Sequence, residues 1–172
     1  HLELMQGEGW VGVRWDGRVV LSAAFDGREA VGRGLIGLGA DVHARDEGMA
    51  PLFIAAQEGH GTVVPALSEL GADNIKPRDN GVTPLFKAAE KGHETVVRAL
   101  IELGADINKA RDDGATPLFI AAQHGHETVV WALIELGVDV NKTKDLGVTA
   151  LFIAAQNGHQ TVARAPTKFG AD

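Results

Sequence analysis

Histidine is the residue of this chain whose spacing most resembles a metal site. His60, His93, His126 and His159 recur every 33 residues, and His124 lies two residues before His126. Zinc ligands lie about 2.1 Å from the ion and hence within roughly 4 Å of one another, whereas packed helices are about 8 to 10 Å apart. We therefore predict no metal, and expect each recurring ring to bond a neighbouring backbone group.

Residues for covalent catalysis and for cofactor binding are poorly represented. Serine occurs only at Ser22 and Ser68, outside any nucleophile-elbow pattern, and the chain has no cysteine. Two GxGxxG matches, at residues 7–12 and 32–37, lack the preceding strand and following helix that dinucleotide binding requires. No phosphate-loop motif is present. We therefore predict a protein that is not an enzyme and has no cofactor.

The charge balance argues against nucleic acid as a partner. The chain has a formal net charge of −7, so phosphate backbones and anionic membrane surfaces repel it at long range. Three pairs of cations nevertheless recur with a spacing of two: Lys76 with Arg78, Lys109 with Arg111, and Lys142 with Lys144. Because Asp79, Asp112, Asp113 and Asp145 lie among them, we predict a solvated edge of mixed charge. The alternative is a basic stripe that recognises an acidic partner.

These residues lie on a repeating unit. Turn glycines occur at Gly48, Gly81, Gly114 and Gly147, which are 33 residues apart, and a degenerate copy precedes them. A unit this short cannot bury its own apolar face, so the copies must stack into an elongated array. In the copy at 114–146, Thr116 and Pro117 start a short helix. Gly125 ends it, a second apolar helix runs to Gly137, and a polar hairpin-like finger follows.

The runs "GVTPLFKAAEKGHETVVRALIELGADIN" from Gly81 and "GATPLFIAAQHGHETVVWALIELGVDVN" from Gly114 resemble the ankyrin repeat. The resemblance is strong over residues 48–172 and weak over 16–47. It implies an all-α solenoid of stacked helix-turn-helix units, and a structural role for the Gly-His pair. One departure recurs, because Phe53, Phe86, Phe119 and Phe152 stand where the family usually has histidine. We expect apolar packing there in place of a polar link between repeats.

We divide the chain into an N-terminal extension or cap, residues 1–15, and a repeat domain, residues 16–172. The copies are 16–47 (degenerate), 48–80, 81–113, 114–146 and 147–172 (truncated). Gly32, Gly34 and Gly37 should loosen the second helix of the first copy, whose finger is one residue short. Interior prolines break helices, so Pro65 is tolerated only in a first turn and Pro166 ends the last helix early. We expect Trp10, Val11 and Val13 to cover the N-terminal end of the core.

By resemblance to the family, a partner protein contacts the finger tips and the exposed residues of the first helices, which line the concave side. The finger positions that vary between copies are Glu47, Met49, Asn80, Val82, Asp113, Ala115, Leu146 and Val148. The helix positions are Gln57, Glu58, Glu90, Lys91, Gln123, His124, Gln156 and Asn157. Trp131 aligns with Pro65, Arg98 and Arg164, and we expect it to be exposed.

The sequence thus predicts a non-enzymatic protein–protein interaction module, a scaffold or adaptor whose partner it does not identify. Two alternatives stay open: a permanently bound subunit of a large assembly, and a regulatory region of a longer enzyme or channel. The His1 start and the Asp172 end suggest a fragment of something longer. The longest apolar runs are far below the roughly 20 residues of a membrane helix. The first fifteen residues lack the basic, apolar pattern of a signal peptide, and we expect an intracellular, cytoplasmic location.

Overall fold

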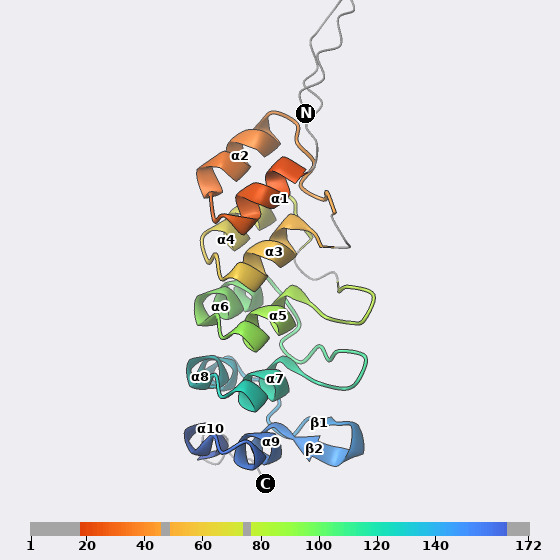
Figure 1. The fold of residues 1–172 in the computed structure, drawn as a ribbon, viewed down its shortest axis with the longest axis vertical. Coiled ribbons are helices and arrows are strands. Elements are labelled where there is room, and N and C mark those ends of the chain that lie inside the picture. Colours follow the sequence, from red (N-terminus) through yellow and green to blue (C-terminus); the bar gives the residue numbers. More distant parts are fainter. Residues whose placement is uncertain (1–17, 46–48, 74–76, 165–172) are drawn as a thin grey trace, which may run out of the picture.

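The computed structural model describes residues 18–45, 49–73 and 77–164. The helices in these residues alternate between two layers (Figure 1). We call one set the inner helices: α1 (Arg18–Phe25), α3 (Pro51–Glu58), α5 (Pro84–Lys91), α7 (Pro117–His124) and α9 (Ala150–Gln156). The other set are the outer helices: α2 (Glu29–Gly37), α4 (Val63–Glu69), α6 (Glu94–Glu102), α8 (Glu127–Glu135) and α10 (Gln160–Arg164).

Successive inner helices pack side by side, and so do successive outer helices, which gives an elongated stack. The connections from each outer helix to the next inner helix, residues 38–50, 70–83, 103–116 and 136–149, are the fingers. They project from the side of the stack opposite the outer helices (Figure 1). The last finger contains a two-stranded antiparallel sheet, β1 (Thr143–Lys144) with β2 (Val148–Thr149), joined by the 3₁₀ turn η1 (Asp145–Gly147). The predicted all-α solenoid is confirmed.

The start of each inner helix follows from its sequence. The hydroxyl oxygens of Thr83, Thr116 and Thr149 accept hydrogen bonds from the backbone N–H three residues later, at 3.1, 3.1 and 3.2 Å. Each satisfies one of the N–H groups that the first turn leaves without a helical partner. Proline occupies the first position of α3, α5 and α7, where no donor is lost. These helices end at glycines with left-handed backbone, Gly59, Gly92 and Gly125.

A continuous apolar core runs through the stack. The alanine pairs of α3, α5 and α7 are fully buried, and their small side chains let neighbouring helices approach closely. Leu52, Leu85, Leu118 and Leu133 fill the space around them, each contributing about 1.5–3 kcal/mol by leaving water. A seam of small residues therefore runs between successive inner helices. Each copy completes its neighbour's core, as short repeats require.

The recurring histidines tie each copy to the one before it. The Nε2 atoms of His60, His93, His126 and His159 donate hydrogen bonds to the backbone carbonyls of Phe25, Gln57, Glu90 and Gln123, at 2.7, 2.9, 2.9 and 3.2 Å. A carbonyl only accepts, so Nε2 carries the hydrogen. Each ring also lies against a glycine of the preceding copy. The predicted bond from each ring to neighbouring backbone is confirmed, and it crosses between copies.

We call this arrangement the histidine cradle. A Cβ atom placed on Gly27, Gly59, Gly92 or Gly125 would lie 2.5–2.7 Å from the Nδ1 atom of the histidine that it faces. The same glycines have positive φ, between 68° and 83°, which side chains with a Cβ rarely adopt. Two independent constraints therefore favour glycine at these positions: the left-handed backbone, and the lack of space for a Cβ beside the histidine ring of the next copy.

The prolines and glycines that the sequence analysis expected to weaken helices are accommodated in different ways. Pro65 is the third residue of α4, and the N–H groups of a first turn have no helical acceptor. Proline is therefore accommodated there, as the sequence allowed. The helix α2 forms across Gly32, Gly34 and Gly37; Gly32 is buried beside Ala23. Pro166, Trp10, Val11 and Val13, and with them the predicted cap, lie outside the described residues.

Two arginines on the outer helices each link one copy to the next. Arg98 donates to Glu94 at 2.9 Å within α6 and to Glu135 at 2.7 Å on α8, and Arg33 makes the equivalent contacts with Glu29 and Glu69. Trp131 occupies the aligned position in α8, where it is half-buried and packs against the core. The prediction that Trp131 is exposed is therefore wrong, because its large ring folds onto apolar neighbours.

Among the described residues, every helix is too short or too polar to cross a lipid bilayer.

Substitution of the cradle glycine tests the link between copies. Gly92→Ala and Gly104→Ala both place a Cβ on left-handed backbone, with φ of 82° and 90°, but only Gly92 faces a ring. We expect Gly104→Ala to lower the free energy of unfolding by about 1–2 kcal/mol. Gly92→Ala should lower it by a further 1–3 kcal/mol or so, because it displaces His126. Urea denaturation of both variants measures the difference, and equal losses would contradict the cradle.

Candidate functional site

The fingers turn on polar side chains that bond their own backbone. The side-chain oxygens of Asn80 and Asp113 accept from the N–H groups of Val82 and Ala115, at 3.2 and 3.3 Å. The glycine between each pair has positive φ. This is the turn that Asn or Asp followed by Gly favours. It folds the chain back beneath the next inner helix, so Val82 and Ala115 are buried.

Leu146 occupies the same position in the last finger and cannot make this turn. Its side chain has no acceptor, and its backbone is left-handed, with φ of 66°. Among the described residues it is the only one other than glycine with positive φ. The leucine side chain is completely exposed, at 101% of its reference area. A strained backbone and an exposed apolar side chain thus coincide at one finger tip.

The second cation of each finger covers an aromatic ring. Arg78 lies over Phe53, with its Cζ atom 5.5 Å from the ring centroid; Arg111 lies over Phe86 at 5.0 Å. In the last finger the Nζ atom of Lys144 lies 5.5 Å from the centroid of Phe119. The three rings are nearly fully buried. Cations attract the face of an aromatic ring at this range. The expected apolar packing is therefore confirmed for Phe53, Phe86 and Phe119, each of which also holds a finger. It is wrong for Phe152, which is 57% exposed because no described residue covers its ring.

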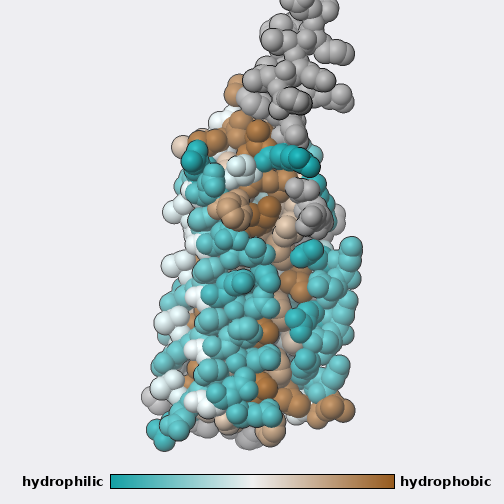
Figure 2. Space-filling view, viewed as in Figure 1, coloured by the Kyte–Doolittle hydropathy of each residue, from teal (hydrophilic) through white to brown (hydrophobic). Residues whose placement is uncertain are grey.

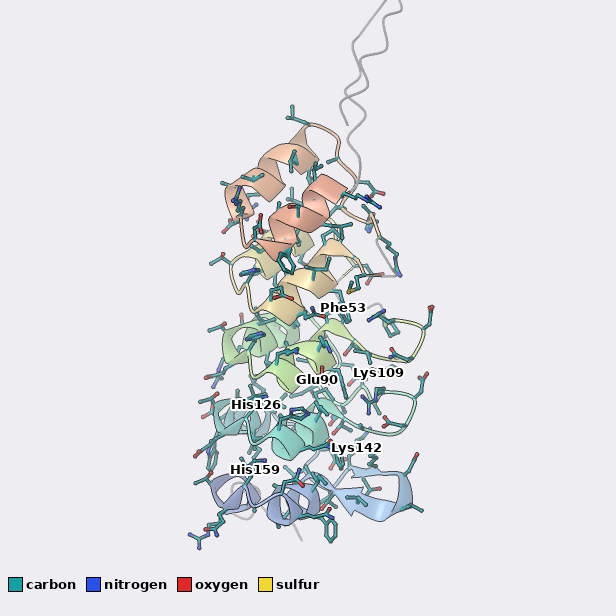
Figure 3. The ribbon with its side chains drawn as sticks, in the orientation of Figure 1. Phe53, Glu90, Lys109, His126, Lys142 and His159 are labelled. Atoms are coloured by element: carbon teal, nitrogen blue, oxygen red, sulfur yellow. The ribbon has the colours of Figure 1, made fainter. Side chains whose placement is uncertain are left out.

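The first cation of each finger behaves differently. Lys109 and Lys142 are exposed (Figure 3), whereas Lys76 lies outside the described residues. The described cations therefore form two rows: an exposed outer row, Lys109 and Lys142, and a half-buried inner row on the rings, Arg78, Arg111 and Lys144. The continuous basic stripe, which was the alternative interpretation of the sequence, is divided by this arrangement.

Asp113 joins two successive fingers. Its carboxylate accepts from Arg111 at 2.8 Å (Nε) and 2.6 Å (Nη2), and it pairs with Lys144 of the next finger at 2.8 Å. The bonds from Arg111, followed by those from Lys144 and the Ala115 N–H, hold the pKa of this carboxyl far below its usual range. One carboxylate therefore fixes two cations, each of which also rests on a phenylalanine.

The structure separates the predicted finger-tip residues into three groups. Asn80 and Leu146 are exposed, and Met49, Asp113 and Val148 are half-buried. Val82 and Ala115 are buried, at 8% and 0% exposure, because the turn brings them beneath the next helix. We withdraw these two from the candidate surface, since they present no side chain to a partner. Glu47 lies outside the described residues.

The predicted helix residues lie at the C-terminal ends of successive inner helices, or directly after them. Gln57, Glu90 and Gln123 are half-buried and supply the carbonyls that hold the histidines. Glu58 is half-buried, while Lys91, His124, Gln156 and Asn157 are exposed. Figure 3 shows Glu90 above His126, with His159 one copy further along. Their common register places these side chains in one row along the stack.

Several members of this row bond one another or the frame. Gln57 donates to Glu58 at 2.8 Å, and Lys87 pairs with Glu90. The ring of His124 stacks on that of His126 at 5.8 Å. Lys91 is the exposed charge of the row at the centre of the stack. In Figure 2, hydrophilic side chains cover the inner helices and the fingers, and a narrow hydrophobic strip separates the two.

A cavity of about 330 Å³ lies between the first two fingers and was not predicted from sequence. Its lining includes His43, Arg45, Phe53, Asp73, Pro77 and Arg78. Among the described residues, no three potential metal ligands come together.

Comparison with protein-family models gives a match to a model described as ankyrin repeats (3 copies), over residues 20–111 and 107–165. Comparison with curated proteins gives no match.

The cation on the ring makes a measurable contribution to stability. We expect Lys144→Met to lower the free energy of unfolding by about 1 kcal/mol, because it removes the contact with Phe119 and the pair with Asp113. Lys142→Met, two residues away in solvent, should leave stability unchanged. Thermal denaturation of both variants makes the comparison, and equal melting temperatures would contradict the assigned role of Lys144.

The Asp113 carboxylate should make stability depend on pH. Its folded-state pKa is depressed, so its stabilisation is complete above the unfolded pKa of about 3.9 and is lost as pH falls through the folded value. Asp113→Asn keeps the turn acceptor but removes the charge. We expect the wild type to be the more stable by a constant margin from pH 7 to 5, and the margin to shrink below about pH 4. A margin independent of pH, measured by urea denaturation, would contradict this.

Proposed function

The chain belongs to the ankyrin-repeat family, and on that premise we propose that it is a non-enzymatic adaptor. Ankyrin repeats are generally protein–protein interaction modules. We propose that this one binds a partner protein through its finger tips and through the row of side chains at the ends of the inner helices.

The division between repeated and variable positions supports this proposal. The buried phenylalanines, the alanine pairs and the histidine cradles recur from copy to copy. At fixed register beside them, the chain carries Glu58, Lys91, His124 and Asn157 in turn. A constant frame that presents different chemistry at equivalent points is suited to the recognition of an irregular protein surface.

Leu146 is the observation that carries the proposal. The other described fingers place Asn80 and Asp113 at its position, where both stabilise the turn. Leucine there forgoes that hydrogen bond, adopts a left-handed backbone and leaves its side chain in water. Nothing in the packing of the described residues accounts for the substitution. An exposed apolar side chain on a rigid finger is, however, suited to insert into a pocket on a partner.

The proposed surface therefore centres on the last two fingers and on α5 and α7. It comprises Met49, Asn80, Asp113, Leu146 and Val148 on the fingers, with Gln57, Glu58, Glu90, Lys91, Gln123, His124, Gln156 and Asn157 on the helices. Asp113 has its carboxylate engaged by Arg111 and Lys144, so it contributes shape and a fixed charge rather than a free acceptor.

Quantitative affinity capture tests this surface, with the full chain as bait and extracts of the source cells as prey. Leu146→Asn should reduce the principal captured protein at least about fivefold, which is a loss of about 1 kcal/mol. The same change should raise stability by roughly 0.5–1 kcal/mol, because asparagine restores the turn bond and tolerates positive φ. Lost binding by a more stable protein cannot be attributed to unfolding.

Leu38→Asn is the matched control, since Leu38 is also exposed, at 68%, but lies at the base of the first finger, at the C-terminal cap of the outer helix α2, and not at a finger tip. It should leave capture unchanged. Lys91→Glu tests the helix row separately and should weaken capture if that row contacts the partner. If Leu146→Asn and Lys91→Glu both leave capture intact, another face of the stack binds.

A further inference from the structure

The central inner helix carries a pair of charges where the helices around it are neutral. The fourth and seventh residues of α3, α7 and α9 are isoleucine and glutamine: Ile54 with Gln57, Ile120 with Gln123, and Ile153 with Gln156. In α5 the same two positions hold Lys87 and Glu90. Among these four helices, α5 alone contains lysine.

The two charged side chains bond each other in a half-buried place. The Nζ atom of Lys87 donates to the carboxylate of Glu90, and the two side chains are 24% and 22% exposed. The isoleucines on the two helices that pack against α5 are 8% and 5% exposed. Glu90, labelled in Figure 3, marks this pair at the centre of the row of inner helices.

Packing of the stack does not account for the pair. Replacing a buried ion pair by apolar side chains of similar volume is often neutral or stabilising. Ile54 and Ile120 show that an isoleucine fits the equivalent position in the neighbouring copies. A charge where the local pattern calls for an apolar side chain points to a role in recognition.

The ammonium group of Lys87 has donors to spare. It carries three hydrogens, and the acceptor that it has among the described residues is Glu90. The flanking isoleucine side chains offer no acceptor, so the remaining hydrogens are left to solvent. A partner lying across the inner helices would displace that water. It must then supply an acceptor, because a buried donor without one is costly.

The charge around Lys87 favours a carboxylate as that acceptor. Lys91 is exposed one turn further along α5, and residues four apart lie on the same face of a helix. The two lysines and the single glutamate give α5 a net charge of +1, in a chain whose formal net charge is −7. The carboxylate aligned with Lys91 in the preceding copy, that of Glu58, accepts from Gln57.

Glu90 is less suited to receive a cation from the partner. Lys87 already binds its carboxylate. The pKa of Arg111 is raised first by its hydrogen bond to Asp113, and the charge of Glu90 adds to the effect, so Glu90 has a second cation within electrostatic range. A third cation would meet repulsion from both.

We propose that Lys87 and Lys91 together receive a carboxylate of the partner protein, from an aspartate or glutamate side chain. This rests on the proposed function, because it requires a partner that lies across the inner helices, and it adds Lys87 to that surface. Lys87 lies between Glu90 and the incoming carboxylate and bonds both. An apolar or basic group at the same point is rejected, since it leaves the ammonium hydrogens unpaired or repels them.

The neighbouring copies supply the variant that tests this. Lys87→Ile combined with Glu90→Gln gives α5 the residues of α7 at both positions. The double change removes one cation and one carboxylate, so the formal net charge stays −7 and the long-range field is preserved. We expect a melting temperature equal to or above that of the wild type. Lys87→Met with Glu90→Gln replaces it if the isoleucine variant does not fold.

A displayed library of random peptides of about 12 residues is the probe, selected on the 172-residue chain after depletion on the double variant. We expect aspartate or glutamate to be enriched at least about threefold at one peptide position. Changing that acid to its amide in a synthetic peptide should weaken binding to the wild type at least about tenfold, and to the double variant less than about twofold. Lys142→Gln, which removes an exposed finger cation, should leave the affinity of the peptide unchanged.

Several outcomes would overturn the proposal. One is a selection in which no peptide distinguishes the two proteins, and another is enrichment of apolar or basic residues. Equal losses for the amide peptide on both proteins would show that its acid does not meet Lys87. Peptides that depend on Leu146 but not on Lys87 would refute this assignment and leave the adaptor surface standing. Acidic peptides that depend on Lys87, with capture unaffected by Leu146→Asn and Lys91→Glu, would uphold the carboxylate site and refute the adaptor surface.

Discussion

The fold depends on one contact repeated along its length: the ring of a loop histidine set between a glycine and a backbone carbonyl of the preceding copy. The ring fills space that any side chain on the glycine would take, and its Nε2–H satisfies a carbonyl at the end of an inner helix. Because each half belongs to a different copy, no copy completes the contact alone. The loop and helix end of each copy therefore have their hydrogen bonds and packing completed only when the copies are stacked.

The fingers hold their position through a second contact, which lies within a copy. A cation from the end of one copy rests on the phenylalanine of its inner helix, and Asp113 joins the cations of two fingers. The exposed residues between these anchors are thus carried on a rigid frame. Leu146 lacks the turn hydrogen bond that its counterparts Asn80 and Asp113 make. At this position the finger is less stable, and it presents an exposed apolar side chain.

Much of this follows from the sequence. The 33-residue period, the Thr-Pro helix starts and the glycine stops all express local backbone preferences, and the structure confirms them. Local backbone preferences do not, however, predict which finger residues are buried. Val82 and Ala115 vary between copies as surface residues do, yet the Asx turn before each carries it beneath the next helix. The division of the finger cations into two rows and the burial of Trp131 likewise depend on contacts between distant residues, which periodicity does not encode.

The tautomer and exchange of the histidine rings test the central claim most directly. Long-range proton–nitrogen NMR spectra report which ring nitrogen carries hydrogen and how fast it exchanges with water. The cradle requires His60, His93, His126 and His159 to be protonated at Nε2, with that hydrogen exchanging slowly, while the exposed His43 exchanges fast. Fast exchange at all of these rings, or an Nδ1–H tautomer at His126, would contradict the account.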